Sequence, residues 1–319
     1  MRRDTFLKSM VAMAATTTLP LSAQAASNLK MMIPANPGGG WDSTGRALGA
    51  ALQAAGVVSA VSYENKGGAA GALGLAQFLN AQKNDPNALM VMGAVMLGGI
   101  ITSRAPVTLT QATPIARLTS EYNVFVLPEN SPFKTMKDVI AQLKKDPGSV
   151  KWGGGSRGST EHIAAAMIAS AVGADPAKIN YVPFRGGGEA TAAILGGNVS
   201  VGGSGYSEFQ QYIESGKMRP IGVTSAQRLK GLNIPTLKEQ GMDVVIGNWR
   251  GVYGAPGISA VQRQALTDMV IKATKSKAWL EALEKNLWTP ALMTGTAFDD
   301  FVDNDFAMLR ATMVKAGML

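Results

Sequence analysis

The 319-residue chain contains no cysteine and a single histidine, His162. The absence of cysteine excludes disulfides, thiolate catalysis and metal sites with thiolate ligands. One histidine alone provides no ligand set for zinc, and the acidic residues do not follow the spacing of a calcium loop. We therefore expect neither a metal nor a cofactor.

Long hydrophobic runs are also missing after residue 25. Glycine or charged residues interrupt every later apolar stretch well short of the roughly 18 residues that a membrane span needs. Residues 1–25 differ, because a basic start is followed by a short apolar run over residues 10–21 and a small-x-small site at residues 23–25. This order is typical of a secretory signal peptide, so we expect an exported protein.

Positive charge is in excess but is not concentrated. The net charge is +8, the basic residues are scattered, and only 6% of the residues are aromatic, so few rings stand beside a lysine or arginine. These features do not predict a nucleic-acid surface. A mild positive field would instead help to collect small anions.

Short apolar segments alternate with helical patterns along the chain, which predicts an α/β fold with mostly parallel sheets flanked by helices. The pattern changes near Ile115 and again near Trp249. The predicted strands cover residues 28–33, 57–63, 88–93, 115–118, 123–127, 150–152, 179–182, 199–203 and 219–224. The predicted helices cover residues 42–55, 71–80, 135–144, 160–172, 188–195, 206–215, 259–276, 277–287 and 296–315.

Three glycine-rich turns each join a predicted strand to a predicted helix. They are PGGGWDST at residues 37–44, GGGSRGST at 153–160 and FRGGGE at 184–189. Glycine permits close backbone approach, and the unpaired N–H groups of a helix start favour a carboxylate or phosphate. Asp42, Ser159 and Thr160 can also be read as ordinary N-caps. The recurrence of the pattern favours shared anion binding.

The segment WGGGSRGSTEH at residues 152–162 also matches two enzyme motifs. A GxSxG hydrolase with Ser156 as nucleophile needs a histidine far downstream, whereas His162 lies six residues away. A dinucleotide loop needs an acidic residue at the end of the next strand, where Asp175 does not lie. Both enzyme classes are therefore disfavoured, and we expect His162 to hydrogen-bond to a neighbouring loop.

Five segments resemble, in order, the periplasmic solute receptors of tripartite tricarboxylate transporters, also called the Bug family. They are PGGGWD from Pro37, YENKGGAAG from Tyr63, GSRGSTEH from Gly155, VPFRGG from Val182 and PTLKEQG from Pro235. The resemblance spans the mature chain. It implies a two-lobed periplasmic binding protein of the Venus-flytrap type II class that acts as a monomer and delivers an organic acid to a permease with a large and a small membrane subunit.

The resemblance also implies which residues bind the ligand. One lobe would comprise residues 26–124 plus 249–319 and the other residues 125–248, with the turns at 37–42 and 153–160 facing each other across one ligand carboxylate. Arg250 would then take a second carboxylate, or form a salt bridge at the surface or between the lobes. The expected ligand-binding residues are Gly39, Gly40, Trp41, Asp42, Ser156, Gly158, Ser159, Thr160, Phe184, Arg185, Gly186 and Arg250.

The sequence thus predicts a periplasmic, non-enzymatic receptor for a small di- or tricarboxylate, with citrate-like acids first. Trp41 leaves an aromatic mono- or dicarboxylate as an alternative, because a ring could stack on it. A binding protein that serves a signalling system is a further alternative, and a serine hydrolase is the least favoured.

Overall fold

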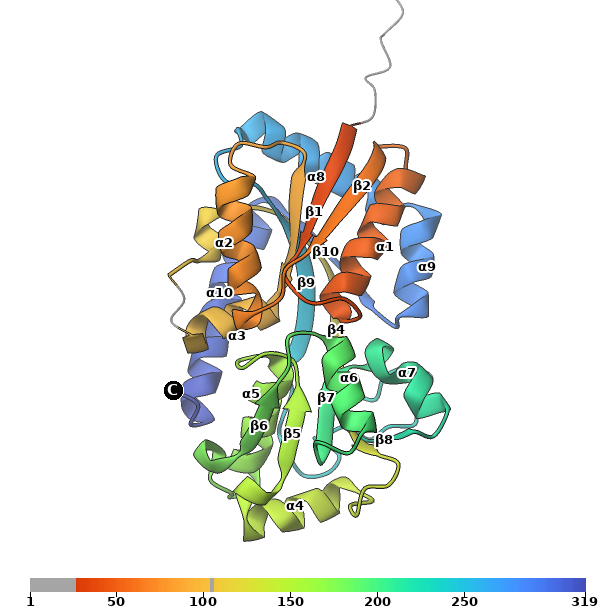
Figure 1. Cartoon of the computed structure of the whole chain (residues 1–319), viewed down its shortest axis with the longest axis vertical. Helices are drawn as coiled ribbons and strands as arrows, with labels where there is room; N and C mark the ends of the chain where they lie inside the picture. Colours follow the sequence, from red (N-terminus) through yellow and green to blue (C-terminus); the bar gives the residue numbers. More distant parts are fainter. Residues whose placement is uncertain (1–26, 104–105) are drawn as a thin grey trace, which may run out of the picture.

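The computed structural model describes residues 27–103 and 106–319, so the predicted signal peptide lies outside the described residues. Within these residues no helix combines the length and apolar character that crossing a membrane requires. Figure 1 shows two groups of strands and helices, one above the other, which we name the upper and lower groups. Strand β4 (Thr113–Pro128) belongs to both.

The upper group is a sheet in the order β2-β1-β3-β9-β4, with β10 also paired to β4. In Figure 1, helices α1 and α9 lie on one side of this sheet, and α2, α3 and α10 lie on the other. The bounds of its elements are β1 Ser27–Ile33, α1 Gly40–Ala54, β2 Val58–Asn65, α2 Ala72–Ala81, β3 Ala88–Gly93, α3 Ala94–Ser103, β9 Gly247–Gly254, α8 Ala260–Thr274, α9 Lys277–Lys285, β10 Thr289–Thr294 and α10 Gly295–Lys315.

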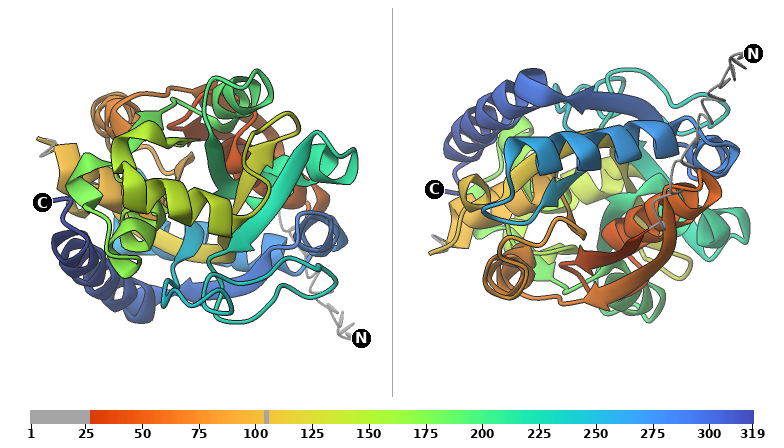
Figure 2. Two further views of the ribbon diagram at one scale, coloured as in Figure 1. Left: turned by 90° about the horizontal axis from the view of Figure 1, so that it is seen from below. Right: turned by 90° about the horizontal axis from the view of Figure 1, so that it is seen from above.

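The lower group continues the sheet from β4 in the order β7-β5-β6, with β8 also paired to β4. Viewed from below, α4 lies nearest to the reader, and viewed from above, α8 does (Figure 2). The bounds of the lower elements are α4 Met136–Lys145, β5 Lys151–Gly154, α5 Thr160–Ala171, β6 Asn180–Pro183, α6 Gly187–Leu195, β7 Val201–Gly205, α7 Tyr206–Glu214 and β8 Met218–Val223.

The sheet is mixed. The predicted parallel pairs are present, β1 with β2 and β3, and β5 with β6 and β7. Strands β4 and β9, however, run antiparallel to each of their partners. These two antiparallel strands lie in the middle of the sheet, between the parallel parts.

Strand β4 corrects the prediction of two separate strands at 115–118 and 123–127. The polar residues between them indicated a break, yet Thr119 and Glu121 are buried within one continuous strand. Its residues up to Tyr122 pair with β9, and from Asn123 onward it pairs with β7 and β8. One strand therefore passes from the upper group to the lower group.

Helix α3 and strands β9 and β10 were absent from the sequence prediction. Six of the ten residues of α3 are buried, so the helix lacks the polar face that makes a helical pattern visible. Strand β9 is interrupted by glycine, asparagine and arginine in its sequence, although seven of its eight residues are buried. Burial on both faces removed the alternation that marks a strand.

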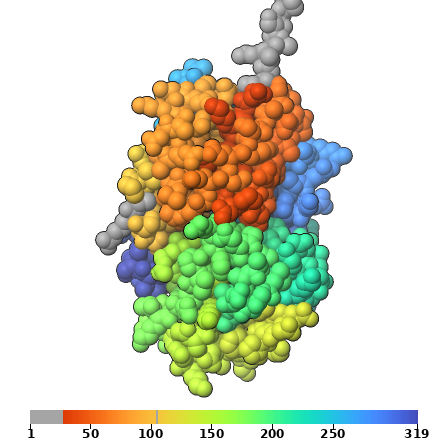
Figure 3. All heavy atoms as spheres, in the orientation of Figure 1, coloured from red at the N-terminus to blue at the C-terminus, as the bar shows by residue number. Residues whose placement is uncertain are grey.

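The two groups share one hydrophobic core. A single cluster of buried side chains runs from Leu29 in β1 to Trp152 in β5, and a smaller cluster surrounds Phe209 under α7. On the face shown in Figure 3, the atoms of the upper and lower groups touch along their boundary. The structure is therefore closed at this boundary.

Candidate functional site

The turn before α1 lies against the turn before α6. A Cβ atom added to Gly39 would lie 2.8 Å from the backbone nitrogen of Gly187. The backbone N–H of Asn36 donates to the carbonyl of Arg185 at 3.3 Å, and its side-chain amide donates to Glu189 Oε1 at 2.6 Å. Neither helix start has a side-chain cap, so two helix N-termini from the two groups meet here.

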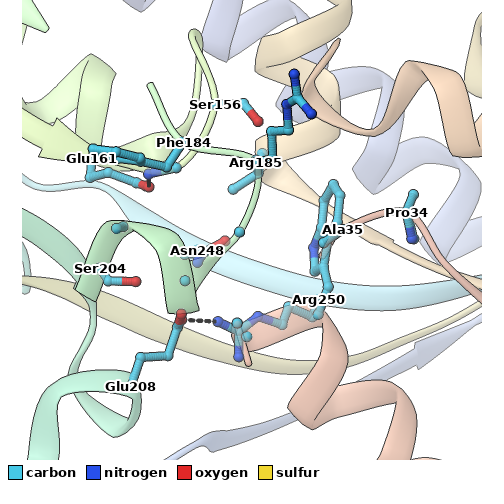
Figure 4. Close-up of a pocket in the computed structure, with 18 of the residues that line it drawn as sticks. Pro34, Ala35, Ser156, Glu161, Phe184, Arg185, Ser204, Glu208, Asn248 and Arg250 are labelled. Atoms are coloured by element: carbon cyan, nitrogen blue, oxygen red, sulfur yellow. Dashed lines mark hydrogen bonds and ion pairs between the residues drawn. The ribbon is translucent and has the colours of Figure 1, made fainter. Parts of the chain in front are cut away.

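A cavity of about 80 Å³ lies where these turns meet (Figure 4). Its volume admits a few water molecules and is below the ~300–1,000 Å³ of ordinary ligand pockets. An outer pocket of about 240 Å³ shares Gly68, Ser156, Phe184 and Arg185 with it. Eight of the predicted ligand-binding residues line the cavity, namely Gly39, Gly40, Trp41, Ser156, Phe184, Arg185, Gly186 and Arg250.

Asp42 is a predicted site residue that is not among those lining the cavity. Its Oδ2 accepts from the backbone N–H of Gly38 at 3.2 Å, and its Oδ1 accepts from Arg46 and Asn65 at 3.0 Å each. Although burial acts to raise the pKa of Asp42, the hydrogen bonds from Arg46, Asn65 and Gly38 lower it overall. The carboxylate therefore holds the turn in shape.

Gly158, Ser159 and Thr160 are also not among the residues that line the cavity, whereas Ser156 of the same turn is. Gly158 packs against α3, since a Cβ atom there would lie 2.4 Å from the carbonyl oxygen of Gly98. Ser159 Oγ caps α5 by accepting from the N–H of His162 at 3.4 Å. The turn that faces residues 37–42 is the one at 184–189.

The start of α5 is closed by its own side chains. His162 Nδ1 accepts from the N–H of Gly158 at 2.9 Å, and its ring stacks on Tyr181 with centroids 4.1 Å apart. Burial, with a smaller contribution from Arg157, lowers the pKa of His162 to about 4, so the imidazole is neutral at pH 7. The prediction that His162 hydrogen-bonds to a loop is confirmed.

Arg250 lies on β9 at the base of the cavity and is only 2% exposed. Its Nη2 donates to Glu121 Oε1, and to Glu208 Oε1 at 3.2 Å. Its guanidinium carbon also lies 5.5 Å from the centroid of the Trp288 ring. Of the two roles predicted for Arg250, the structure shows the ion pair, which joins it to α7 of the lower group.

Glu208 brings a carboxylate to the start of α1. Besides Arg250, its hydrogen-bond donors are the Ser204 hydroxyl and the backbone N–H groups of Gly40 and Gly205. A Cβ atom on Gly40 would lie 1.8 Å from Arg250 Nη2, so glycine is needed for this approach. The helix start predicted to hold an anion thus contacts a carboxylate of the protein itself.

Three glutamates surround this site, Glu121 and Glu161 buried and Glu208 with its side chain 9% exposed, and the sequence prediction named none of them. Glu161 and Glu208 line the cavity, and Glu121 lies behind Arg250. Burial is the largest cause that raises the pKa of all three, that of Glu121 to about 7. The glycine-rich segment VGGSG at 201–205, which forms β7 directly ahead of α7 and Glu208, was the signal that could have revealed Glu208.

The comparisons with known proteins agree with this geometry. The family model described as "Tripartite tricarboxylate transporter family receptor" matches residues 48–318. The chain belongs to this receptor family. Among its relatives, protein BugT of Bordetella pertussis is 25% identical over 305 residues, which cover 93% of this chain and 92% of BugT.

Solved structures show the same fold. The periplasmic binding protein BugD matches with a TM-score of 0.82 and 21% identity, covering 92% of this receptor and 98% of BugD. MatC of Rhodopseudomonas palustris with bound malate matches with a TM-score of 0.79 and 18% identity, covering 92% of this chain and 99% of MatC. An R. palustris protein with adipate matches with a TM-score of 0.82 and 19% identity, covering 92% of this chain and 98% of that protein. The family and the fold are those of substrate-binding receptors.

Throughout residues 27–103 and 106–319, no group of three or more His, Cys, Asp or Glu side chains could hold a metal ion. His162 Nδ1 is engaged by Gly158 rather than by Ser156. Ser156 lines the cavity as a polar group of the turn.

Proposed function

We propose that this receptor is a periplasmic, non-enzymatic protein that captures a small di- or tricarboxylate. Its two lobes, residues 26–124 plus 249–319 and residues 125–248, close on the acid. The closed form then delivers the acid to a permease with a large and a small membrane subunit.

The observation that carries the proposal is the meeting of the uncapped starts of α1 and α6 at the cavity. The N–H of Gly40 hydrogen-bonds to the carboxylate of Glu208, which indicates the chemical group that this helix start accepts. A ligand carboxylate between the two starts would interact with both lobes at once. Such a ligand favours the closed state by its higher affinity for it.

A second carboxylate of the ligand would lie toward the mouth of the cavity. Arg185 is exposed there and Ser156 is partly exposed, and both line the inner cavity and the outer pocket. The inner cavity is small and bordered by Glu161 and Glu208, which disfavours a third carboxylate. We therefore place dicarboxylates ahead of citrate-like acids. Two proteins with the same fold are solved with the dicarboxylates malate and adipate.

A thermal-shift screen followed by calorimetry tests the proposal. The panel contains C4 to C6 dicarboxylates, citrate, an aromatic acid, a sugar and a neutral amino acid. We expect stabilisation by one or more dicarboxylates, since a ligand that binds only the folded state raises its stability by mass action. Stabilisation by the sugar or the neutral amino acid, with none by any carboxylate, would contradict it.

Delivery to the permease requires a separate measurement. Vesicles that contain the two membrane subunits should accumulate the acid only when the loaded receptor is added. Binding of the acid without any uptake, together with capture of a sensor protein, would favour the signalling alternative.

A further inference from the structure

Two buried polar atoms at the cavity, Arg250 Nη1 and Asn248 Oδ1, have no hydrogen-bond partner among the described residues. Their residues are 2% and 5% exposed, and both line the cavity (Figure 4). Because the two residues are separated by one position on β9, their side chains leave the same face of the strand. Buried polar atoms are nearly always paired, so an unpaired donor and acceptor at a closing cavity indicate a place for a polar group of the ligand.

The orientation of the Asn248 amide follows from its neighbour Glu121. The Asn248 Nδ2 atom donates to Glu121 Oε1 at 3.3 Å, and the same carboxylate accepts from Arg250 Nη2 and from Trp288 Nε1. Because Glu121 Oε1 already accepts from the Arg250 guanidinium, the amide nitrogen of Asn248, a donor, is the atom that faces this oxygen. The amide oxygen is thereby left as the acceptor.

The charge of Arg250 is already compensated. Glu121 and Glu208 both contact Nη2, so two carboxylates share one guanidinium. A ligand carboxylate beside Nη1 would be repelled by both glutamates and could not donate to Asn248 Oδ1. An ammonium group could donate to Asn248, but it could not accept from Arg250 and would bring two cations together.

A hydroxyl group satisfies both atoms, because it accepts one hydrogen bond and donates another. We propose that Asn248 and Arg250 form a hydroxyl subsite, so that the receptor selects hydroxy acids over acids of the same skeleton without the hydroxyl. This inference rests on the proposed function and adds a role for Arg250 to it. Arg250 recognises the hydroxyl, and the carboxylates of the ligand are left to the helix starts and Arg185.

Calorimetry with four C4 acids tests the subsite on the unmodified protein. L-malate and D-malate carry the hydroxyl, succinate lacks it, and L-aspartate carries an ammonium group in its place. We expect one malate enantiomer to bind on the order of ten- to hundredfold more tightly than succinate, as for a hydrogen bond to a charged group. L-aspartate should bind more weakly than that enantiomer.

The outcomes separate this inference from the proposed function. Equal affinity for malate and succinate would overturn the hydroxyl subsite and leave the dicarboxylate receptor intact. Tighter binding of L-aspartate would overturn it in favour of an ammonium subsite. If the receptor binds none of these acids and no other carboxylate of the panel, the proposed function fails and the subsite fails with it.

Asn248→Ala tests the role of Asn248 in the subsite, with Ser156→Ala as its matched control. It should reduce the preference for malate over succinate to within about threefold, with most of the change in the malate affinity. Ser156→Ala, which alters the cavity away from β9, should weaken both acids by similar factors and retain the preference. If Asn248→Ala keeps the full preference for malate, the assignment of the hydroxyl to Asn248 is wrong. The comparison of acids on the unmodified protein does not depend on the folding of any variant.

Discussion

Helices α1 and α5 both begin after a glycine-rich turn, yet the structure uses the two starts differently. At α5, the N–H of Gly158 is taken by His162 and that of Gly155 by Glu161, so the start is satisfied from within its own segment. At α1, Asp42 accepts from the N–H of Gly38, but no side chain of the segment caps the helix itself, and the N–H of Gly40 reaches a glutamate from the other group. A helix start is available for binding only where local side chains leave it open.

The largest expected effect comes from filling the open start. In Gly40→Ala the new Cβ atom would lie 1.8 Å from Arg250 Nη2 of the same group and 2.8 Å from Glu208 Oε1 of the lower group, so it would disturb both the ion pair and the closed contact. We expect the affinity for the ligand acid to fall on the order of a hundredfold, as for an overpacked contact. Calorimetry would measure the affinity, and small-angle scattering would show whether the ligand still compacts the protein.

Gly148→Ala is the control for this substitution. Gly148 is exposed and its nearest contact for an added Cβ atom is at 3.5 Å, so the affinity should stay unchanged. If Gly40→Ala binds the acid as tightly as the unmodified protein, the closed contact at the α1 start is not part of the bound state.

The next largest effect concerns how the folding stability depends on pH through His162 at the start of α5. The pKa of His162 is lowered by burial from about 6.5 to about 4, so the unfolded chain binds a proton at a higher pH than the folded chain. Its contribution to stability is therefore present above pH 6.5 and is lost as the pH falls toward 4. His162→Gln removes this loss. When the pH falls from 7 to 4.5, the free energy of unfolding of the variant should therefore rise by about 2 kcal/mol relative to that of the unmodified protein.

Urea unfolding of both proteins at the two pH values measures this gain. Burial raises the pKa of Glu121 to about 7, and this contribution has the opposite sign, being largest at low pH and lost as the pH rises through 7. Both proteins contain Glu121, so its effect cancels in the difference. A difference that stays constant between pH 7 and pH 4.5 would show that His162 does not titrate as the structure indicates.

The smallest effects come from two serines of one turn. Ser159 caps α5 and pairs with Tyr181 OH at 3.1 Å, so Ser159→Ala should lower the free energy of unfolding by about 1 kcal/mol without changing affinity. Ser156 lines the cavity, so Ser156→Ala should weaken binding about threefold to tenfold with stability unchanged. Unfolding curves and calorimetry on both variants would separate the roles, and the reverse pattern would place the ligand at α5.

The contrast between the two starts also explains what the sequence could predict. Strand β3 at Ala88–Gly93 was placed at its observed bounds, and α5 to within a residue, because their apolar patterns are local. Three glycine turns were recognised, but their partners were not, since the pairing of residues 37–42 with 184–189 depends on how separate elements pack. Glu121, Glu208 and Asn248 escaped notice because a buried polar residue shows its role only through its neighbours.

The chain passes between the upper and lower groups along β4 and again just before β9, and this has a consequence for ligand release. Glu121 lies on β4, and Asn248 and Arg250 lie on β9, each near the point where the chain passes between the two groups. In a receptor that opens and closes, a substitution at any of these three residues would alter both the affinity for the ligand and the resistance of the strands to bending. Residence time and selectivity should therefore change together at these positions, whereas changes at residues 184–186 should tune selectivity alone.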